Sequence, residues 1–244
     1  MATERREHQP WLYQVEPWPP DDTEESVLGT DLHQTTIRNL AIGINMAARV
    51  GRQHEEPSLW RALTQLEYVG CRRPDGSLLR TYPDLFVFRH AFDPLRGSFS
   101  LAVDGPPSLI VEVLSESTYR SDLNLERGKA YSYRGVGVPE YLVIDPTYSM
   151  LRGGVSGWRL DGETYRPWEP GTDGRLHSEQ IPLAIALEGV LARVYLRDGR
   201  PMPREEEVVD ALAQRDEALA RERAQRYKDH EELERLRRLL AERG

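Results

Sequence analysis

Three short, almost wholly apolar segments in the middle of the chain constrain its fold most strongly. They span residues 85–88 (LFVF), 109–114 (LIVEVL) and 139–146 (PEYLVIDP). Apolar runs of this length are typical of strands that are buried on both faces of a sheet. The polar, proline-free residues 122–134 lie between the second and third runs, and we expect a helix there with Asp122 as its N-cap. A strand, a helix and a strand in this order predict a βαβ unit in a covered sheet, and hence an α/β fold.

Glu112 lies in the middle of the second apolar run, where an ionised carboxylate needs a compensating partner. Asp84 opens the first run directly after a proline, so the two carboxylates meet at one end of the sheet if their strands are neighbours. Two carboxylates in close approach repel each other unless a cation lies between them. Mg²⁺ is often held by one or two carboxylates, with water completing its shell. The plainer interpretations are an arginine salt bridge for Glu112 and a strand-end cap for Asp84.

Lys129 is unusual because it is one of only two lysines among 32 basic residues, the other being Lys228. On a helix that begins at Asp122, Lys129 would lie one turn before Tyr133, on the same helical face. A lysine ammonium can orient a water molecule and stabilise a developing anion. An ordinary surface lysine is the competing interpretation, because a coding preference for arginine also makes lysine scarce.

These residues belong to a longer series of matching elements. In chain order, the series is Pro83-Asp84, residues 109–118 (LIVEVLSEST), Asp122, Lys129, Tyr133, residues 137–141 (GVPEY) and Ile144-Asp145-Pro146. The series resembles the signature of the Uma-two family, a family of restriction-endonuclease-like proteins in the PD-(D/E)XK nuclease superfamily. The specific motifs cover residues 82–146, and a weaker similarity extends from residue 25 to residue 200.

The resemblance implies a restriction-endonuclease-like fold, with a mixed central sheet flanked by helices, and metal-dependent hydrolysis of phosphodiester bonds. By this resemblance Asp84 and Glu112 bind the metal ion, Mg²⁺ or Mn²⁺, and the backbone carbonyl of Val113 adds a ligand. The wider superfamily has a lysine two residues after the glutamate, where this chain has Leu114. The family places its lysine on the following helix, and Lys129 takes that role of assisting the attacking water.

We expect three segments along the chain. Residues 1–24 form a proline-rich N-terminal arm, residues 25–203 the nuclease-like domain, and residues 204–244 a charged helix. His33, on the first helix of the domain, matches a histidine that is common near the site in the family, although a lone histidine on an amphipathic helix is also often a packing residue. In the last segment leucines recur every seven residues with an interruption at Arg226, which fits a coiled coil or a single solvated helix held by Glu–Arg pairs.

The charge and the single cysteine limit the partners and the location. The formal net charge is −8, so the chain has no general attraction to nucleic acid. A nucleic-acid partner, DNA in the first place, would need a local basic surface, for which the candidates are Arg72, Arg73, Arg80, Arg89, Arg96, Arg120, Arg127 and Arg134. These arginines could equally pair with the many acids.

Cys71 as the single thiol indicates a reduced, cytoplasmic protein, and no apolar run is long enough to cross a membrane. We expect a homodimer, since double-strand cleavage needs two sites.

Other function classes compete with a nuclease. The first is a catalytically inactive nuclease-fold module for binding or assembly, which the acidic charge and the C-terminal helix favour. The second is a hydrolase that uses the acid pair on another substrate such as a sugar, for which Trp158 and Trp168 are the available aromatic side chains. A serine or cysteine nucleophile has little support, because Ser115 and Ser117 lack a surrounding motif and Cys71 lacks a clear base.

Overall fold

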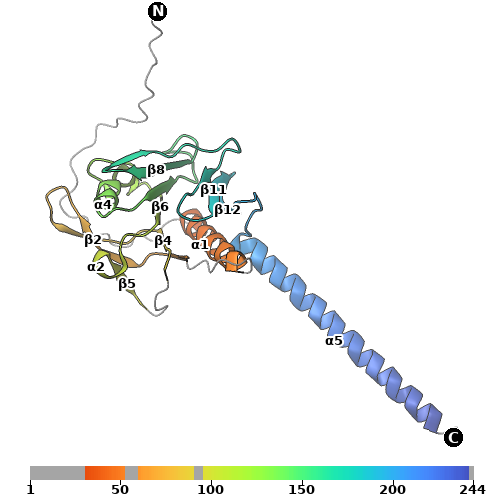
Figure 1. Cartoon of the computed structure of the whole chain (residues 1–244). Coiled ribbons are helices and arrows are strands. Elements are labelled where there is room, and N and C mark those ends of the chain that lie inside the picture. Colours follow the sequence, from red (N-terminus) through yellow and green to blue (C-terminus); the bar gives the residue numbers. More distant parts are fainter. Residues whose placement is uncertain (1–30, 53–59, 91–95, 242–244) are drawn as a thin grey trace, which may run out of the picture. The chain divides into compact units, whose positions relative to one another are not determined.

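The computed structural model (Figure 1) describes residues 31–52, 60–90 and 96–241. The chain divides into two compact units, Met1–Met202 and Pro203–Gly244. The predicted N-terminal arm, residues 1–24, lies outside the described residues. No helix of the described part is long and apolar enough to span a membrane.

A six-stranded mixed sheet forms the centre of the first unit, in the order β1-β4-β6-β7-β8-β9. The strands are β1 (Arg61–Leu63), β4 (Leu85–Phe88), β6 (Leu109–Val113), β7 (Glu140–Ile144), β8 (Val155–Asp161) and β9 (Thr164–Pro167). β6 and β7 pair in parallel, and the other neighbours in this sheet pair antiparallel. The three apolar runs of the sequence therefore became β4, β6 and β7, and every residue of these strands is buried. The prediction of an α/β fold with a mixed central sheet and a charged C-terminal helix is confirmed.

Two smaller sheets and five helices complete the described structure. The sheet β3-β2-β5 contains β2 (Glu67–Arg72), β3 (Leu78–Thr81) and β5 (Ser98–Ser100), and the sheet β10-β11-β12 contains β10 (Leu176–His177), β11 (Leu183–Glu188) and β12 (Leu191–Leu196). The helices are α1 (Asp31–Arg52), α2 (Leu101–Asp104), α3 (Tyr119–Asp122), α4 (Lys129–Gly135) and α5 (Glu205–Ala241).

Strand alternation divides the core into two layers. Side chains such as Val87, Val111 and Leu142 pack with α1 and with β11 and β12 on one face of the central sheet. Side chains of opposite parity, such as Ile110 and Val143, pack with α4 and with the β3-β2-β5 sheet on the other face. Because successive residues of a strand point to opposite faces, Glu112 shares the face of Ile110 and is turned toward α4.

A glycine lets α1 approach its layer closely. A Cβ at Gly43 would lie 2.8 Å from the Cβ of Val194 on β12, so the helix packs there with its backbone. Leu40 and Ile44 flank this contact and are fully buried. This close packing helps to position α1 on the sheet, and the first turn of α1 carries His33 to the end of β6.

The prediction of a helix that begins at Asp122 is wrong. Asp122 is the last residue of α3, and a loop follows before Gly128 caps α4. The Asn124 side chain accepts hydrogen bonds from the backbone N–H groups of Glu126 and Arg127, which gives the chain a turn in place of a helix. A Cβ at Gly128 would lie 1.9 Å from the carbonyl oxygen of Ser121, so the loop closes tightly only with glycine at this position.

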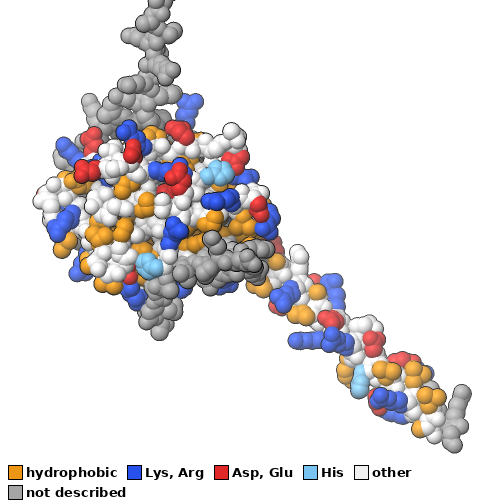
Figure 2. All heavy atoms as spheres, in the orientation of Figure 1, with side chains coloured by type: hydrophobic (Ala, Val, Ile, Leu, Met, Phe, Trp, Pro, Cys, Tyr) orange, Lys and Arg blue, Asp and Glu red, His pale blue; other side chains and the backbone are white. Residues whose placement is uncertain are grey.

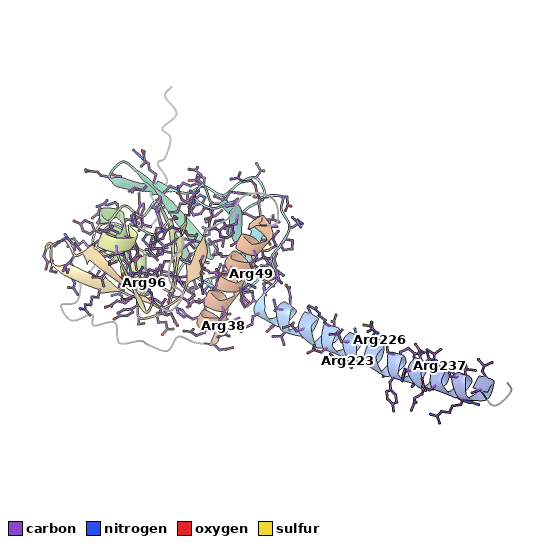
Figure 3. All side chains as sticks on the ribbon, turned by 60° about the horizontal axis from the view of Figure 1, so that its bottom comes forward. Arg38, Arg49, Arg96, Arg223, Arg226 and Arg237 are labelled. Carbon is purple, nitrogen blue, oxygen red and sulfur yellow. The ribbon has the colours of Figure 1, made fainter. Side chains whose placement is uncertain are left out.

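The second unit is α5, a 37-residue helix with acidic residues in its first turn. Almost all of its described side chains are exposed, and Figure 3 shows Arg223, Arg226 and Arg237 projecting from it. Ion pairs between residues one helical turn apart, such as Arg226 with Glu222 at 2.6 Å, lie along the helix surface.

Asp145 organises the loop that follows β7. One carboxylate oxygen accepts hydrogen bonds from the N–H groups of Met150 (2.6 Å) and Leu151 (2.7 Å), and the other from the N–H (3.0 Å) and hydroxyl (2.6 Å) of Thr147. Burial raises the pKa of Asp145, but these hydrogen bonds outweigh burial and the net pKa is lowered. The carboxylate thereby accepts hydrogen bonds from three backbone N–H groups that would otherwise lack a partner within the protein.

We predict that Asp145→Asn lowers the free energy of unfolding by about 2–4 kcal/mol, because an amide cannot accept on both sides and leaves buried N–H groups unsatisfied. The lowered pKa means that the carboxylate stabilises the fold above its unfolded-state pKa of about 4 and that this contribution is lost as the pH falls through the folded-state value. Urea unfolding at pH 7 and pH 3 measures both effects. The exposed Asp161→Asn serves as the control, and equal stability of the two variants at pH 7 would contradict the prediction.

Candidate active site

The site begins where β4 and β6 lie side by side. Their antiparallel register pairs Leu85 with Val111, and Asp84 comes directly before Leu85 while Glu112 comes directly after Val111. The Oδ2 atom of Asp84 accepts a hydrogen bond from the backbone N–H of Val113 at 2.8 Å. The Asp84 carboxylate therefore contacts the main chain directly after Glu112, and a hydrogen bond fixes it there.

His33 reaches the same point from the first turn of α1. Its Nε2 atom lies 2.9 Å from the carbonyl oxygen of Val113 and 3.4 Å from Oδ2 of Asp84. Burial by itself lowers the pKa of His33, but the hydrogen bond and the charge of Asp84 reverse this effect and the net pKa is raised. The imidazole thus joins the helix to two of the groups that were predicted to bind a metal ion.

Glu112 is buried, with 1% of its surface exposed. The hydroxyl of Tyr133 donates to its Oε1 atom at 2.6 Å, and the ammonium of Lys129 lies 3.4 Å from its Oε2 atom. Lys129 and Tyr133 stand one turn apart on α4, as the sequence predicted, so one short helix supplies both partners. A neutral donor and a cation compensate the carboxylate where water is scarce.

Asp122 is the residue that sequence reasoning missed, because it was assigned to a helix cap. It is fully buried, and its Oδ1 atom lies 3.3 Å from Nζ of Lys129. Burial raises its pKa to about 6, although Lys129 and Thr118 act in the opposite direction, and the charge of Asp84 adds to the increase. The signal in the sequence was its place in the motif series, seven residues before the lysine.

The cluster therefore holds three acids, Asp84, Glu112 and Asp122, and one lysine. Even with His33 protonated, as its raised pKa favours, negative charge exceeds positive charge within a mostly buried region. Desolvation by burial makes such an excess unfavourable, and a divalent cation would neutralise it. The two predicted carboxylate ligands and the carbonyl of Val113 are hard oxygen donors of the kind that Mg²⁺ and Mn²⁺ bind. These residues fit such an ion by charge and by donor type.

Within residues 31–52, 60–90 and 96–241, no group of three or more His, Cys, Asp or Glu side chains is arranged to hold a metal ion. The predicted ligand set contains two such side chains and one backbone oxygen, so it relies on water for the other positions. The Asp84 side chain is 17% exposed, against 1% for Glu112. Solvent thus reaches Asp84 more than Glu112.

The structure gives local partners to several arginines that were candidates for a phosphate-facing surface. Arg80 pairs with Glu67 at 3.2 Å, and Arg96 pairs with Asp104 at 2.5 Å. On the face drawn in Figure 2, basic and acidic side chains are interspersed over the first unit. Pairing and interspersion of this kind do not single out one basic surface.

The competing nucleophile and sugar interpretations gain no support. Burial raises the pKa of the Cys71 thiol to about 12, which keeps it protonated near neutral pH. Trp158 stacks on Tyr141 with ring centroids 5.7 Å apart, and Trp168 is only 3% exposed beneath Arg159. These rings serve the core and offer no open platform beside the acids.

Comparison with known proteins confirms the resemblance drawn from the motifs. The family model Uma2, described as "Putative restriction endonuclease", matches residues 25–189. A solved structure described as a putative nuclease belonging to DUF820 from Anabaena variabilis is 18% identical, with a TM-score of 0.36, over 57% of this chain and 68% of that chain. The comparison with curated proteins finds no match.

We predict that Lys129→Met lowers the free energy of unfolding at pH 8 by about 3–5 kcal/mol, because two buried carboxylates lose their shared cation. The pKa of Asp122 is raised to about 6 with Lys129 present, and loss of the lysine raises it further, so Asp122 is protonated at pH 5 and the defect of the variant shrinks there. Chemical unfolding at both pH values measures this. The matched control is Lys228→Met on the exposed helix α5, and a defect that is the same at pH 8 and pH 5 would argue against buried charge as its cause.

Proposed function

We propose, because the chain belongs to the Uma2 family, that it is a divalent-metal-dependent endonuclease that hydrolyses phosphodiester bonds. The observation that carries the proposal is the convergence of Asp84 and Glu112 through Val113, with Lys129 in contact with the second acid. A buried acid cluster with an excess of negative charge is unfavourable for folding alone, so its presence points to a bound cation in the working state.

The residues of the chain divide the work. Asp84 and Glu112, with the carbonyl of Val113, would hold Mg²⁺ or Mn²⁺, which when bound supplies Lewis acidity toward the phosphate and an activated water. Lys129 orients that water and offsets the negative charge that develops in the transition state. His33 holds the Val113 carbonyl and the Asp84 carboxylate in place through its two contacts.

DNA is the proposed substrate, on the strength of the family description as restriction endonucleases. The net charge of −8 does not oppose this, because most of it lies outside the domain. Residues 25–203 contain 22 acidic and 20 basic side chains, whereas residues 1–24 contain six acidic and two basic ones. We also propose a cytoplasmic location, since the single cysteine is a buried free thiol that a reducing compartment would preserve.

We predict that the purified full-length protein cleaves labelled DNA duplexes or plasmid with Mn²⁺ or Mg²⁺, and that a chelator stops cleavage. Glu112→Gln and Asp84→Asn should each reduce the single-turnover rate at least 100-fold, since loss of the metal contribution costs several kcal/mol of transition-state stabilisation. Gel-based product formation measures the rate.

Glu140→Gln is the matched control for these variants. Glu140 is also buried on a central strand, but Ser178 and Arg159 contact it outside the acid cluster. The amide keeps the size and shape of the side chain, so this variant removes a buried carboxylate of the same type at a position outside the cluster. Cleavage by the control, and none by the two site variants, is the expected pattern. Binding of DNA without cleavage under every metal would instead favour the alternative of an inactive nuclease-fold binding or assembly module.

We further propose that α5 pairs with the α5 of a second copy in antiparallel orientation. Leu212, Leu219 and Leu233 lie on one seven-residue register that Arg226 interrupts, and they are 40–55% exposed, which leaves apolar side chains for a partner helix. Residues 205–222 carry seven acidic and two basic side chains, and residues 223–241 carry six basic and four acidic ones. Antiparallel pairing places the acidic half of each helix beside the basic half of the other, whereas parallel pairing places like charges together.

Light scattering of the full chain should give a dimer, and replacement of Leu212, Leu219 and Leu233 by lysine should give a monomer.

The orientation of the two helices is tested by cross-linking of single introduced cysteines, since Cys71 is buried and unreactive. Arg226→Cys, at the interrupted seam position near the middle of α5, should cross-link to itself, while Val209→Cys near one end should not. Cross-linking at both positions would show a parallel pair, and a monomeric starting protein would exclude pairing. Val103→Lys, at an exposed valine of the first unit, is the control for added surface charge.

A further inference from the structure

We infer that Asp122 is a positioning residue of this site: it shares Lys129 with Glu112, and so allows Glu112 to exchange the lysine for a divalent cation. The inference rests on the proposed function, because it concerns how the same acids accept a metal ion. It assigns a role to a buried acid that the ligand set and the attacking-water role leave unused.

The distances show that the lysine is shared. Its Nζ atom lies 3.4 Å from Oε2 of Glu112 and 3.3 Å from Oδ1 of Asp122. Both acids expose 1% of their surface or less, and Lys129 exposes 8%. Since the two separations are nearly equal, Coulomb attraction alone does not favour one acid over the other. One ammonium therefore serves two carboxylates in a region where each would otherwise need its own counter-charge.

Asp122 is poorly satisfied by anything else. Neither of its carboxylate oxygens has a hydrogen bond of good geometry, and Lys129 and Thr118 are the polar groups that favour its charged form. A carboxylate that is fully buried in this condition is costly, and natural cores retain such groups chiefly where they serve a site. A carboxylate at position 122 thus contributes little to the stability of the fold by itself.

The backbone around Asp122 is fixed from two sides. The hydroxyl of Tyr141 on β7 donates to the carbonyl oxygen of Asp122 at 2.8 Å. On the other side, the N–H of Gly128 donates to the carbonyl of Asn124 at 3.0 Å, and the tight loop returns the chain to Lys129. A short closed loop therefore sets the distance between the acid and the lysine, and the break between α3 and α4 is what brings them face to face.

The sharing has a consequence for metal binding. If Lys129 had Glu112 as its sole acidic partner, a cation approaching Glu112 would have to displace the lysine and leave a buried ammonium uncompensated. With Asp122 in contact, the lysine keeps a counter-charge at 3.3 Å and stays beside the reacting centre. Asp122 also adds one negative charge to the cluster, which increases its attraction for a divalent ion.

Binding of Mn²⁺ to the full-length protein, followed by electron paramagnetic resonance or calorimetry, tests the inference without relying on cleavage. Asp122→Asn should raise the Kd for Mn²⁺ at least tenfold, because it removes a charge and strengthens the competing Lys129–Glu112 pair. Asp122→Glu keeps the charge and should bind within about threefold of the unmodified protein. Glu140→Gln, a buried acid outside the cluster, should leave the Kd unchanged even where it lowers stability.

The outcomes separate this inference from the proposed function. If the unmodified protein does not bind Mn²⁺, both fall together. If it binds Mn²⁺ and Glu112→Gln abolishes binding while Asp122→Asn binds as tightly as before, the metal site stands and the role of Asp122 is wrong. Should Asp122→Asn fail to fold, Asp122→Glu still decides: a folded, charge-retaining variant that loses Mn²⁺ binding as completely as Glu112→Gln contradicts a role through charge.

Discussion

The sharing of one lysine between two buried acids is the interaction on which the rest of the site depends. Glu112 and Asp122 come from different elements, a central strand and the end of a short helix, and Lys129 contacts both. Buried carboxylates are tolerated only with such compensation, so the packing of α4 against the sheet and the electrostatics of the cluster stabilise each other. Tyr133 adds a neutral donor from the same helix, which completes the surroundings of Glu112 without adding charge.

The sheet supplies the geometry of the cluster. Strand alternation turns Glu112 toward α4, while the neighbouring backbone at Val113 is left for Asp84 and His33. The antiparallel β4–β6 register brings Asp84 alongside, and α1 lies close enough for His33 because Gly43 has no side chain at its contact with Val194. Two core layers on opposite faces of one sheet thus converge at a single strand end, where backbone and side-chain groups are held within hydrogen-bonding distance.

The sequence predicted the three central strands because long apolar runs have few other ways to fold. It also placed Lys129 and Tyr133 on one helical face, since helical spacing is a local property. It failed at Asp122, because the helix was expected to start there, and the turn made by Asn124 and the tight packing of Gly128 on Ser121 broke it instead. The contact of Asp122 with Lys129 depends on that loop, and the contact of Asp84 with Val113 depends on strand register, so neither could be read from spacing.

Burial also changes what the charge of the protein means for a polyanionic partner. Among the residues of the domain whose burial the structure describes, the acids Glu112, Asp122, Glu140 and Asp145 are buried, and so is the base Lys129. Once these are set aside, 19 basic and 18 acidic side chains remain in residues 25–203. Exposed charges decide long-range attraction, whereas buried ones act on what enters the site. An acidic chain can thus combine a domain of nearly balanced remaining charge with an acidic interior.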